Sequence, residues 1–474
     1  MTQKKFIKEG EVRLMKKKLL SLTLCVAMAA TVFAGCGSDS KDAKKDSGSD
    51  KKQESNKGDG SEGSVYFLNF KPESEEAFNE IAEKFTEEEG ISCKVVTAAN
   101  NQYESTLKAE MAKSDAPTAF IINGPVGYNS WKDYCADMSD TELYSKLVDK
   151  NGTVSTDEGV FGIPMATEYY GLICNKTIFA DYFALDGIAD TGCKSIEDIN
   201  NFEKLSAVVK DMDKHKDDLG ISGVFSEPAL NSDNNWRIQT HLTNVPIYYE
   251  YKADGVSDKD ELDFTYADNY KNILDLYLDY ATVSREAASS GSVDEAMAEF
   301  ALGECAIVQN GNWGWGQISG TDGCTVKADD IYFMPIYTGI EGEESQGLCA
   351  GTENFLAYNA KASDADREAT DKFFTWLYTS DTGKAYVKDD LGFISPFEGA
   401  DTPDDPLVKQ GIADSANSET TSVTWNFTTF PGQAWKNALG EDLLKYAEGS
   451  LDWDTVIKNA KDQWASEKAS ASAE

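Results

Sequence analysis

Aromatic side chains stand beside glycines and polar groups in several parts of this sequence. Trp313 lies in the run N-G-N-W-G-W, between glycines that allow a backbone and an indole ring to approach another molecule closely. A pyranose sugar has an apolar C–H face and an edge of hydroxyls, so its site needs aromatic rings for the face and charged or amide groups for the edge. The pattern therefore predicts a sugar-binding surface with Trp313 as its leading candidate.

Two further aromatic groups have the same character. Trp236 and Arg237 lie in S-D-N-N-W-R-I-Q-T-H, where the indole would stack on a ligand and the guanidinium would supply a bidentate donor. Trp425 and Phe427, in V-T-W-N-F-T-T-F-P, would form another aromatic face. For each of these residues the alternative is plain packing in a core.

Motifs for metal or catalytic chemistry have little support. His215 and His241 are the two histidines, and neither lies in an H-E-x-x-H or G-x-S-x-G context. Residues 149–157 imitate the start of a calcium loop, but the expected glycine at its sixth position and glutamate at its twelfth are absent. We interpret this run as a polar turn and expect no metal, no cofactor and no catalytic residue.

The elements that would position these side chains alternate between strand and helix. Apolar runs rich in strand formers occur at 65–70, 93–97 and 118–122, and helical spacing occurs between them. This alternation predicts an α/β fold with a mostly parallel sheet covered on both faces. Ligands bind such sheets outside the carboxyl ends of the strands. The candidates there lie on two predicted loops, 69–73 and 123–131, and are Asn69, Lys71, Glu73, Asn123, Tyr128 and Trp131.

Residues 1–35 are predicted to be a signal peptide and are set aside from the fold. Lysines at 16–18 precede an apolar core at 19–32, which is too short to span a bilayer. Met15 directly precedes these lysines and is an alternative start of translation to Met1. The run V-F-A-G-C around Cys36 resembles the bacterial lipobox, in which the cysteine is lipidated, although Phe33 replaces the more usual leucine.

Residues 36–63 are predicted to be the lipidated cysteine and a disordered tether. They are rich in Ser, Gly, Asp and Lys and contain no aromatic residue, so they cannot bury enough apolar surface to fold. A flexible linker of this length reaches roughly 25–30 Å. Lipid, tether and folded body together predict a protein anchored at the extracellular face of the cell membrane.

Charge and cysteine content exclude other classes of protein. The net charge of -38 would repel phosphate backbones, so we expect no nucleic-acid partner. Beyond the signal peptide and Cys36, the cysteines have no close pairs and no metal-type spacing. Most are interpreted as small buried residues, with one disulfide left open. They are Cys93, Cys135, Cys174, Cys193, Cys305, Cys324 and Cys349.

Ordered sequence blocks carry a resemblance to a known family. G-V-F-G-I-P-M-A-T-E-Y-Y-G-L-I-C-N-K spans 159–176, and E-F-A-L-G-E-C-A-I-V-Q-N-G-N-W-G-W spans 299–315. Y-F-M-P-I follows from 332 and G-T-E-N-F-L-A-Y-N-A-K-A-S from 351. In this order and at these separations, the blocks resemble the family 1 extracellular solute-binding proteins of carbohydrate ABC importers, the family of maltose-binding protein. The resemblance extends to L-D-W-D-T-V-I-K-N-A-K-D-Q-W near the end of the chain.

The resemblance implies a two-lobed, periplasmic-binding-protein-like fold with a hinge, in which each lobe is discontinuous in sequence. By this analogy the N-lobe would comprise 64–167 plus 353–402. The C-lobe would comprise 168–352 plus 403–474. A ligand would bind between the two lobes.

The resemblance also implies roles for residues in two of the blocks. The first tryptophan of the family's G-x-W-x-W motif stacks on sugar, and Trp313 holds that position, while Trp315 is expected to pack. Glu168 aligns with a carboxylate that accepts sugar hydroxyls beside the hinge, and Tyr169 and Tyr170 would add stacking. The chain departs from maltose-binding protein in the N-lobe loops, where Lys71 replaces an aspartate and Asn123 a stacking tryptophan. A carbohydrate other than maltodextrin is therefore expected.

The expected function is capture of a carbohydrate and its delivery to a membrane importer. The predicted partners are the sugar, two ABC permease subunits with their ATPase, and the membrane through the lipid on Cys36. We expect a monomer without enzymatic activity. The first alternative is a secreted glycoside hydrolase, since paired carboxylates beside an aromatic cleft suit that chemistry. The second keeps the two-lobed fold but binds a peptide, a polyamine or a metal ion.

Overall fold

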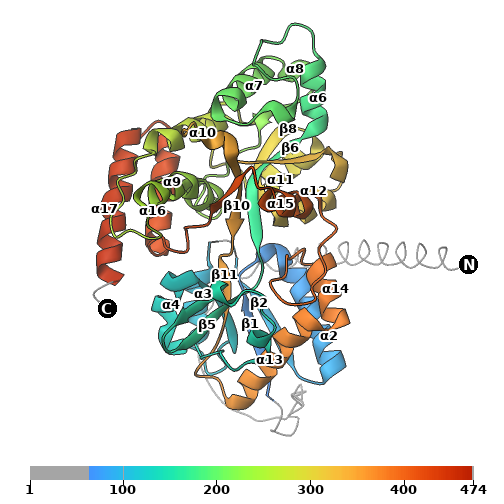
Figure 1. The fold of residues 1–474 in the computed structure, drawn as a ribbon, viewed down its shortest axis with the longest axis vertical. Helices are drawn as coiled ribbons and strands as arrows, with labels where there is room; N and C mark the ends of the chain where they lie inside the picture. The colour runs from blue at the N-terminus through green and yellow to red at the C-terminus, as the bar shows by residue number, and fades with distance from the viewer. Residues whose placement is uncertain (1–62, 100, 472–474) are drawn as a thin grey trace, which may run out of the picture. The chain divides into compact units, whose positions relative to one another are not determined.

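The computed structural model describes residues 63–99 and 101–471, which form two lobes, each built around one sheet (Figure 1). The predicted signal peptide, Cys36 and nearly all of the predicted tether lie outside the described residues. No helix within the described part of the chain has both the length and the apolarity to cross a membrane.

The sheet of the N-lobe has the strand order β2-β1-β3-β11-β5-β4. Its strands are β1 (Val65–Asn69), β2 (Cys93–Thr97), β3 (Ala119–Asn123), β4 (Val154–Thr156), β5 (Gly159–Pro164) and β11 (Asn354–Tyr358). All five residues of β1 and all five of β11 are buried, because helices cover both faces of the sheet. These helices are α2 (Glu75–Glu89), α3 (Tyr103–Met111), α4 (Gly124–Trp131), α5 (Glu142–Ser145), α13 (Asp364–Thr379) and α14 (Asp381–Asp389).

The prediction of a mostly parallel sheet holds for only part of the N-lobe. β1 pairs parallel with β2 and β3, as alternating strands and helices require. β11 pairs antiparallel with both β3 and β5, and β4 pairs antiparallel with β5. The reason is that β11 enters this sheet directly from the other lobe rather than through a strand–helix–strand unit. The sheet is therefore mixed.

The predicted loop at 123–131 is wrong, because this segment is the helix α4. The run N-G-P does end β3, but Pro125 stands in the first turn of a helix, where its missing N–H is tolerated. Gly124 makes the turn between strand and helix with a φ of 58°, which glycine adopts readily.

The sheet of the C-lobe has the order β12-β10-β6-β8-β7, and β9 also pairs with β6. Its strands are β6 (Glu168–Asn175), β7 (Gly223–Phe225), β8 (Cys305–Gly311), β9 (Ile331–Met334), β10 (Gln346–Gly351) and β12 (Thr421–Thr424). β6 is buried along its whole length and pairs antiparallel with β8, β9 and β10. It is the centre of this lobe.

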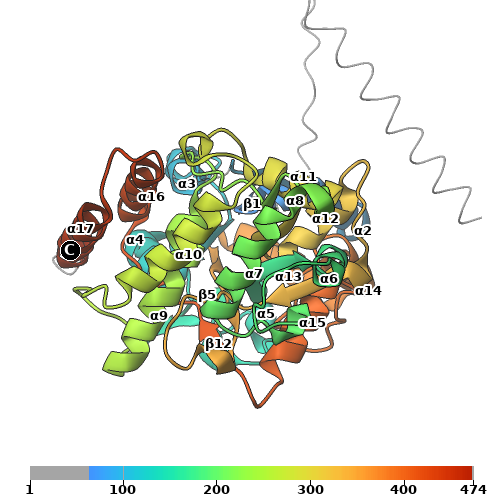
Figure 2. The same cartoon turned by 90° about the horizontal axis from the view of Figure 1, so that it is seen from above.

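The helices of the C-lobe pack on both sides of its sheet, and α16 and α17 lie side by side at one edge (Figure 2). They are α6 (Lys176–Ala184), α7 (Phe202–Lys214), α8 (Lys216–Leu219), α9 (Thr243–Asp254), α10 (Ala267–Asp279), α11 (Val293–Leu302), α12 (Trp315–Gly320), α15 (Pro406–Ser415), α16 (Gln433–Ala447) and α17 (Trp453–Ala471). A π-helical segment, η5 (Arg237–Leu242), precedes α9 without a break. Short 3-10 turns include η1 (Pro72–Ser74) after β1 and η7 (Asn312–Gly314) after β8.

Each lobe has its own aromatic core. In the N-lobe, Phe67 of β1 lies 5.4 Å from Phe78 of α2 and 5.2 Å from Phe374 of α13, measured between ring centroids. In the C-lobe, the fully buried rings of Trp435 and Trp464 meet edge to face at 5.0 Å and fix α17 against α16. The seven cysteines of the described residues are free thiols, and all except Cys93 and Cys324 are buried.

The chain crosses between the lobes at neighbouring points. β5 of the N-lobe leads through residues 165–167 into β6, and β10 of the C-lobe leads through 352–353 into β11 (Figure 1). A third crossing joins α14 to α15. The crossings bond to one another, since Thr352 Oγ1 donates to the carbonyl of Ala166 at 2.7 Å and the Thr167 amide donates to the carbonyl of Ile394 at 2.9 Å. Each lobe is thus discontinuous in sequence, while the predicted lobe boundaries themselves stay a prediction.

Candidate functional site

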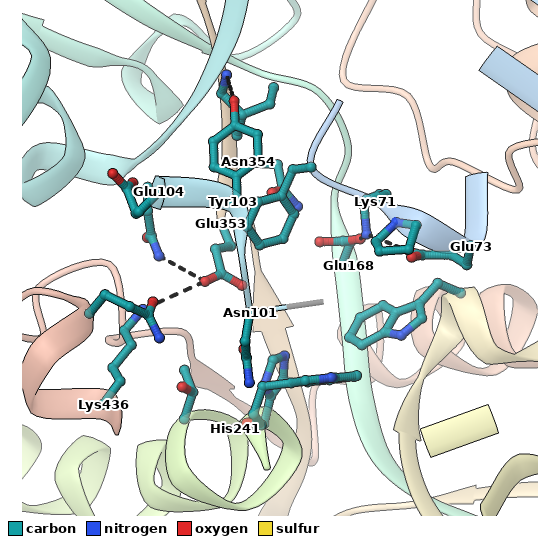
Figure 3. Close-up of a pocket in the computed structure, with 18 of the residues that line it drawn as sticks. Lys71, Glu73, Asn101, Tyr103, Glu104, Glu168, His241, Glu353, Asn354 and Lys436 are labelled. Carbon is teal, nitrogen blue, oxygen red and sulfur yellow. Dashed lines mark hydrogen bonds and ion pairs between the residues drawn. The ribbon is translucent and has the colours of Figure 1, made fainter. Parts of the chain in front are cut away.

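A pocket lies beside the crossing segments and takes its lining from both lobes (Figure 3). Its empty space measures about 1040 Å³, counting the part that is open to solvent. This is the scale of a site for a small molecule. The side chains around it fall into an aromatic wall and two charged groups.

The aromatic wall comes from the C-lobe and consists of Trp236, Trp313, Trp425 and His241. The ring centroid of Trp313 lies 6.2 Å from that of Trp236 and 6.3 Å from that of Trp425. The His241 ring lies among the three indoles, 5.0 to 5.8 Å from each. Rings at such angles and distances form stable edge-to-face contacts. The wall is therefore a packed unit held together by contacts between its own rings.

Trp313 owes its position to the glycine that ends β8. The indole folds back over Gly311, where a Cβ would lie 2.1 Å from the ring. A residue with any side chain at this point would push the indole out of the wall. The glycine predicted to allow a close approach therefore accommodates the indole itself.

His241 belongs to the π-helical segment η5, which also presents Gln239 and Thr240 to the pocket. Burial among the indoles lowers the pKa of His241 to about 3, against a weaker opposing effect of the Trp236 carbonyl. The imidazole is thus neutral at physiological pH and acts as an aromatic ring with one donor and one acceptor. Three successive residues of this π-helical segment line the pocket, and such turns are frequent at functional sites.

The first charged group consists of Lys71, Glu73 and Glu168. Lys71 Nζ lies 2.6 Å from Glu168 Oε1 and 3.4 Å from Glu73 Oε1, and it stands 5.1 Å from the centre of the Trp313 ring. Lys71 and Glu73 follow β1 in the N-lobe, whereas Glu168 is the first residue of β6. Burial opposes the charge of Lys71, but the attraction of Glu168 and Glu73 outweighs it and raises the pKa of Lys71 above its ordinary value.

The second charged group consists of Glu104, Glu353 and Lys436, on the other side of the pocket (Figure 3). Glu353 lies on the crossing between β10 and β11, accepts from Asn123 Nδ2 at 2.8 Å and lies 3.9 Å from Lys436 Nζ. Burial raises the pKa of Glu353, and Lys436 opposes the rise. Burial lowers the pKa of Lys436, whereas Glu353 and Glu104 raise it.

The structure brings more than half of the predicted site residues to this pocket. They come from six separate parts of the chain and line one pocket. These residues are Lys71, Glu73, Asn123, Glu168, Trp236, Trp313 and Trp425.

Two predicted residues of α4 point into the N-lobe instead of the pocket. Tyr128 stacks on Phe161 with ring centroids 4.8 Å apart. Trp131 packs edge to face on Phe120 and donates from Nε1 to Glu104 at 3.1 Å. Because the segment is helical, its side chains project around an axis rather than toward the open end of the sheet. Trp131 thus contacts the pocket only through the carboxylate that it holds.

Three further predicted residues are buried away from the pocket lining. Asn69 brackets the Lys71 backbone, donating to its carbonyl at 2.8 Å and accepting from its amide at 3.1 Å. Tyr169 packs in the C-lobe core against Gly411. Arg237 donates to the backbone carbonyls of Gln309, Glu227 and Pro228 at 3.1 to 3.4 Å. Asn69 shapes the loop that carries Lys71, and the other two support the C-lobe.

Sequence reasoning missed His241, Glu353, Lys436 and Glu104. His241 was set aside as a histidine without a motif, and a π-turn has no periodicity that a helical pattern would reveal. Glu353 stands in G-T-E-N-F-L, between two strand-like runs. That position was the one sequence signal for a residue near a crossing between the lobes. Lys436 of α16 and Glu104 of α3 carry no such signal, because only the tertiary fold brings these two helices to one pocket.

One contact joins the lobes at the rim of the pocket. Asn101 of the N-lobe donates from Nδ2 to the carbonyl of Ser232 in the C-lobe at 2.7 Å. Its backbone has a φ of 54°, a conformation that asparagine tolerates better than most residues. The described lobes are thus in contact across the mouth of the pocket as well as at the crossings.

A separate acidic cluster has metal-like spacing but already holds a cation. Glu250, Asp254 and Asp263 lie close together at the end of α9. Lys259 Nζ lies between them, 2.7 Å from Glu250 and 2.8 Å from Asp254. The lysine ammonium fills the place that a metal ion would take.

The comparisons with known proteins identify a family and a fold. A family model described as bacterial extracellular solute-binding protein matches residues 80–463. No curated protein sequence matches the chain. Among solved structures, a chitin oligosaccharide binding protein aligns with a TM-score of 0.67 and 17% identity, over 86% of this chain and 100% of that one.

Two other solved structures are similar to the same extent. RafE in complex with raffinose aligns with a TM-score of 0.65 and 16% identity, over 85% of this chain and 99% of that one. The GacH receptor of Streptomyces glaucescens, solved unliganded and with acarbose, aligns with a TM-score of 0.63 and 16% identity, over 86% and 99% of the two chains. At these identities the likeness concerns the fold. The predicted two-lobed α/β fold with discontinuous lobes is confirmed.

The surroundings of Arg237 generate a prediction about pH. Glu227 is buried beside it on the loop after β7, faces Glu299 and Glu295 of α11, and has one carboxylate oxygen without a partner in the described structure. Burial, with repulsion from Glu299 and Glu295, raises the pKa of Glu227 from 4.5 to about 7, and Arg237 opposes the rise. The carboxyl therefore ionises at lower pH in the unfolded chain than in the folded protein. Stability falls as the pH rises through this range.

We expect Glu227→Gln to leave the free energy of unfolding nearly unchanged at pH 4.5, where the folded protein keeps this carboxyl neutral. At pH 8 the substitution should raise it by about 1–3 kcal/mol, because the amide carries no charge to bury. Urea unfolding at the two pH values measures the difference. Glu419→Gln, at an exposed position, is the control and should show no such pH dependence. An equal effect of Glu227→Gln at both pH values would contradict the prediction.

Proposed function

Because the chain belongs to the bacterial extracellular solute-binding proteins, which bind solutes and are not enzymes, we propose that it captures a carbohydrate between its two lobes. The captured sugar is then delivered to an ABC importer in the membrane. The proposal concerns the pocket described above, with its aromatic wall and charged groups. The hydrolase alternative falls with the family assignment.

The observation that carries the proposal is that the aromatic wall, carboxylates and amides surround one pocket. Trp313 and its neighbours offer ring faces and edges of the kind that pack on the C–H face of a pyranose. Glu168 and Glu353 offer carboxyl oxygens as acceptors for hydroxyl groups, and Lys436 and Asn123 offer donors. A hydroxyl both donates and accepts, so it suits a lining that alternates carboxylate and ammonium groups.

Closure of the lobes follows from where these groups come from. The aromatic wall belongs to the C-lobe, whereas Lys71, Glu73 and Asn123 belong to the N-lobe. A ligand that contacts both sets binds the closed arrangement more tightly than the open one, and it shifts the equilibrium only by that difference. The crossings at 165–167 and 352–353 are where the backbone would bend.

The structural neighbours support a carbohydrate as the solute. Three of them are a chitin oligosaccharide binding protein, RafE in complex with raffinose, and the GacH receptor in complex with acarbose. These ligands belong to those proteins, and at 16–17% identity they support only the class of ligand proposed for this chain. The type, length and linkage of the sugar for this chain depend on its own lining residues.

The proposed setting is the extracellular face of the membrane, with Cys36 as the lipidated residue and residues 36–63 as the tether. The family implies two permease subunits with their ATPase as the partners that receive the sugar. Labelling of the protein by a radioactive fatty acid tests the anchor. We expect incorporation into the natural sequence and none into Cys36→Ser, and equal labelling of both would contradict the proposal.

Calorimetric titration of the purified protein against a panel of oligosaccharides tests capture. The panel should include raffinose, chitin oligosaccharides, xylo-oligosaccharides and malto-oligosaccharides. We expect at least one to bind with a micromolar or lower Kd, which corresponds to about -8 kcal/mol or better. Chromatography of the same samples should show no shortened product. Release of monosaccharide, or no binding by any member, would argue against a sugar-capture role.

Trp313→Ala tests the aromatic wall with a matched control two residues away. We expect it to weaken binding of the sugar found in the panel by about 10- to 100-fold, because it removes a stacking face. Trp315→Ala removes the same side chain from α12, where it packs outside the pocket lining, and should change the affinity less than threefold. Equal effects of the two substitutions on the Kd would refute the role of Trp313.

A further inference from the structure

Lys71 is one of the two lysines that line the pocket. Its ammonium group lies 5.1 Å from the centre of the Trp313 ring and 2.6 Å from Glu168. An indole face together with carboxylates is the arrangement that recognises a positively charged ligand. In this protein that position is taken by the protein's own cation.

The Lys71 side chain is held in place rather than free to move. Asn69, which is 2% exposed, bonds to both the amide and the carbonyl of Lys71, and it also donates to Thr97 Oγ1 at 3.2 Å. The backbone of Lys71 is therefore fixed between β1 and η1. Only 11% of its side chain is exposed, and its ammonium bonds to Glu168 and Glu73.

The charge balance of the pocket shows what Lys71 prevents. The lining contains four glutamates, Glu73, Glu104, Glu168 and Glu353, but only two lysines, Lys71 and Lys436. The one other titratable base or acid of carboxyl, amine or imidazole type in the lining is His241, which is neutral. Such an excess of carboxylates attracts cations. Without Lys71, two of these carboxylates would stand unpaired beside the Trp313 face.

A cationic solute could use this part of the pocket only by displacing Lys71. The displaced ammonium would lose its two carboxylate partners while still surrounded by protein, and breaking a buried ion pair is strongly destabilising. An uncharged solute meets no such penalty, because its hydroxyls add to the remaining lone pairs of Glu168 without removing the lysine.

We infer that Lys71 is a built-in cation that closes the pocket to positively charged solutes, and so sets its specificity for uncharged ones. The inference rests on one part of the proposed function, namely that the solute binds in this pocket. The specificity set by Lys71 favours uncharged carbohydrates over polyamines and over sugars that carry free amino groups. Lys71 thereby acts as a specificity-determining residue, and Asn69 as the residue that positions it.

Titration with spermidine tests the inference, because this probe is a flexible polyamine and contains no sugar. We expect the natural protein to show no binding at millimolar spermidine. Lys71→Met keeps an unbranched side chain that is one atom shorter and removes its charge, and it should bind spermidine at least about tenfold more tightly than the natural protein. Lys71→Arg keeps a cation at this point and should exclude spermidine as the natural protein does.

Lys113→Met is the control for loss of one positive charge, since Lys113 lies on the N-lobe surface and pairs with Glu110. It should leave spermidine binding as weak as in the natural protein. Thermal unfolding checks that each variant is folded, and spermidine should raise the Tm of Lys71→Met alone. If Lys71→Met does not fold, Lys71→Gln, which retains donors for Glu168, replaces it.

Two results would overturn the inference. One is submillimolar binding of spermidine by the natural protein, which can be measured whether or not any variant folds. The other is a folded neutral variant at position 71 with no gain in affinity for spermidine. Neither result depends on the oligosaccharide panel, so failure of the specificity inference and failure of the proposed function are distinguished.

Discussion

The antiparallel pairing of β6 with β10 is the constraint on which the site depends. Glu168 lies opposite Gly351 in this pair, and just beyond it both strands leave the C-lobe for the other sheet. The two crossings therefore run side by side, tied by Thr352 and the carbonyl of Ala166. As a result Glu168 and Glu353, far apart in sequence, line one pocket beside these crossings. Moving this register by one residue would turn Glu168 to the opposite face of the sheet.

The second governing condition is that charges buried beside aromatic rings must be balanced before a ligand arrives. An unpaired ion in such surroundings is strongly unfavourable. The protein meets this condition because Lys71 forms an ion pair with Glu168 and His241 is neutral within the aromatic wall. Because these groups are already ordered, a ligand does not have to bear the cost of arranging them. The pairing of Lys71 with Glu168 thus balances charge in the pocket and bears on which solutes the pocket accepts.

Local patterns predicted the elements that local forces determine. The strand at 65–70 and the helix predicted between it and the run at 93–97 are present as β1 and α2, because apolar spacing alone specifies their buried faces. The helix α4 was missed because N-G-P reads equally well as a turn and as a helix start. Trp313 could be singled out from its glycine neighbours, whereas Lys436 and His241 could not. Their place in the pocket depends on the docking of α16 and on a π-turn, which are tertiary features without a sequence period.

The indole wall has a consequence for how the state of this molecule can be observed. Trp313 has an ammonium group 5.1 Å from its ring, and Trp236 and Trp425 lie at its edges. The electric field at an indole sets the wavelength at which it fluoresces, and the position of Lys71 is part of that field. Any movement of the N-lobe loop that carries Lys71, relative to the aromatic wall, alters the emission of Trp313. The molecule thus carries an optical reporter of its own occupancy, placed inside the pocket and requiring no attached dye.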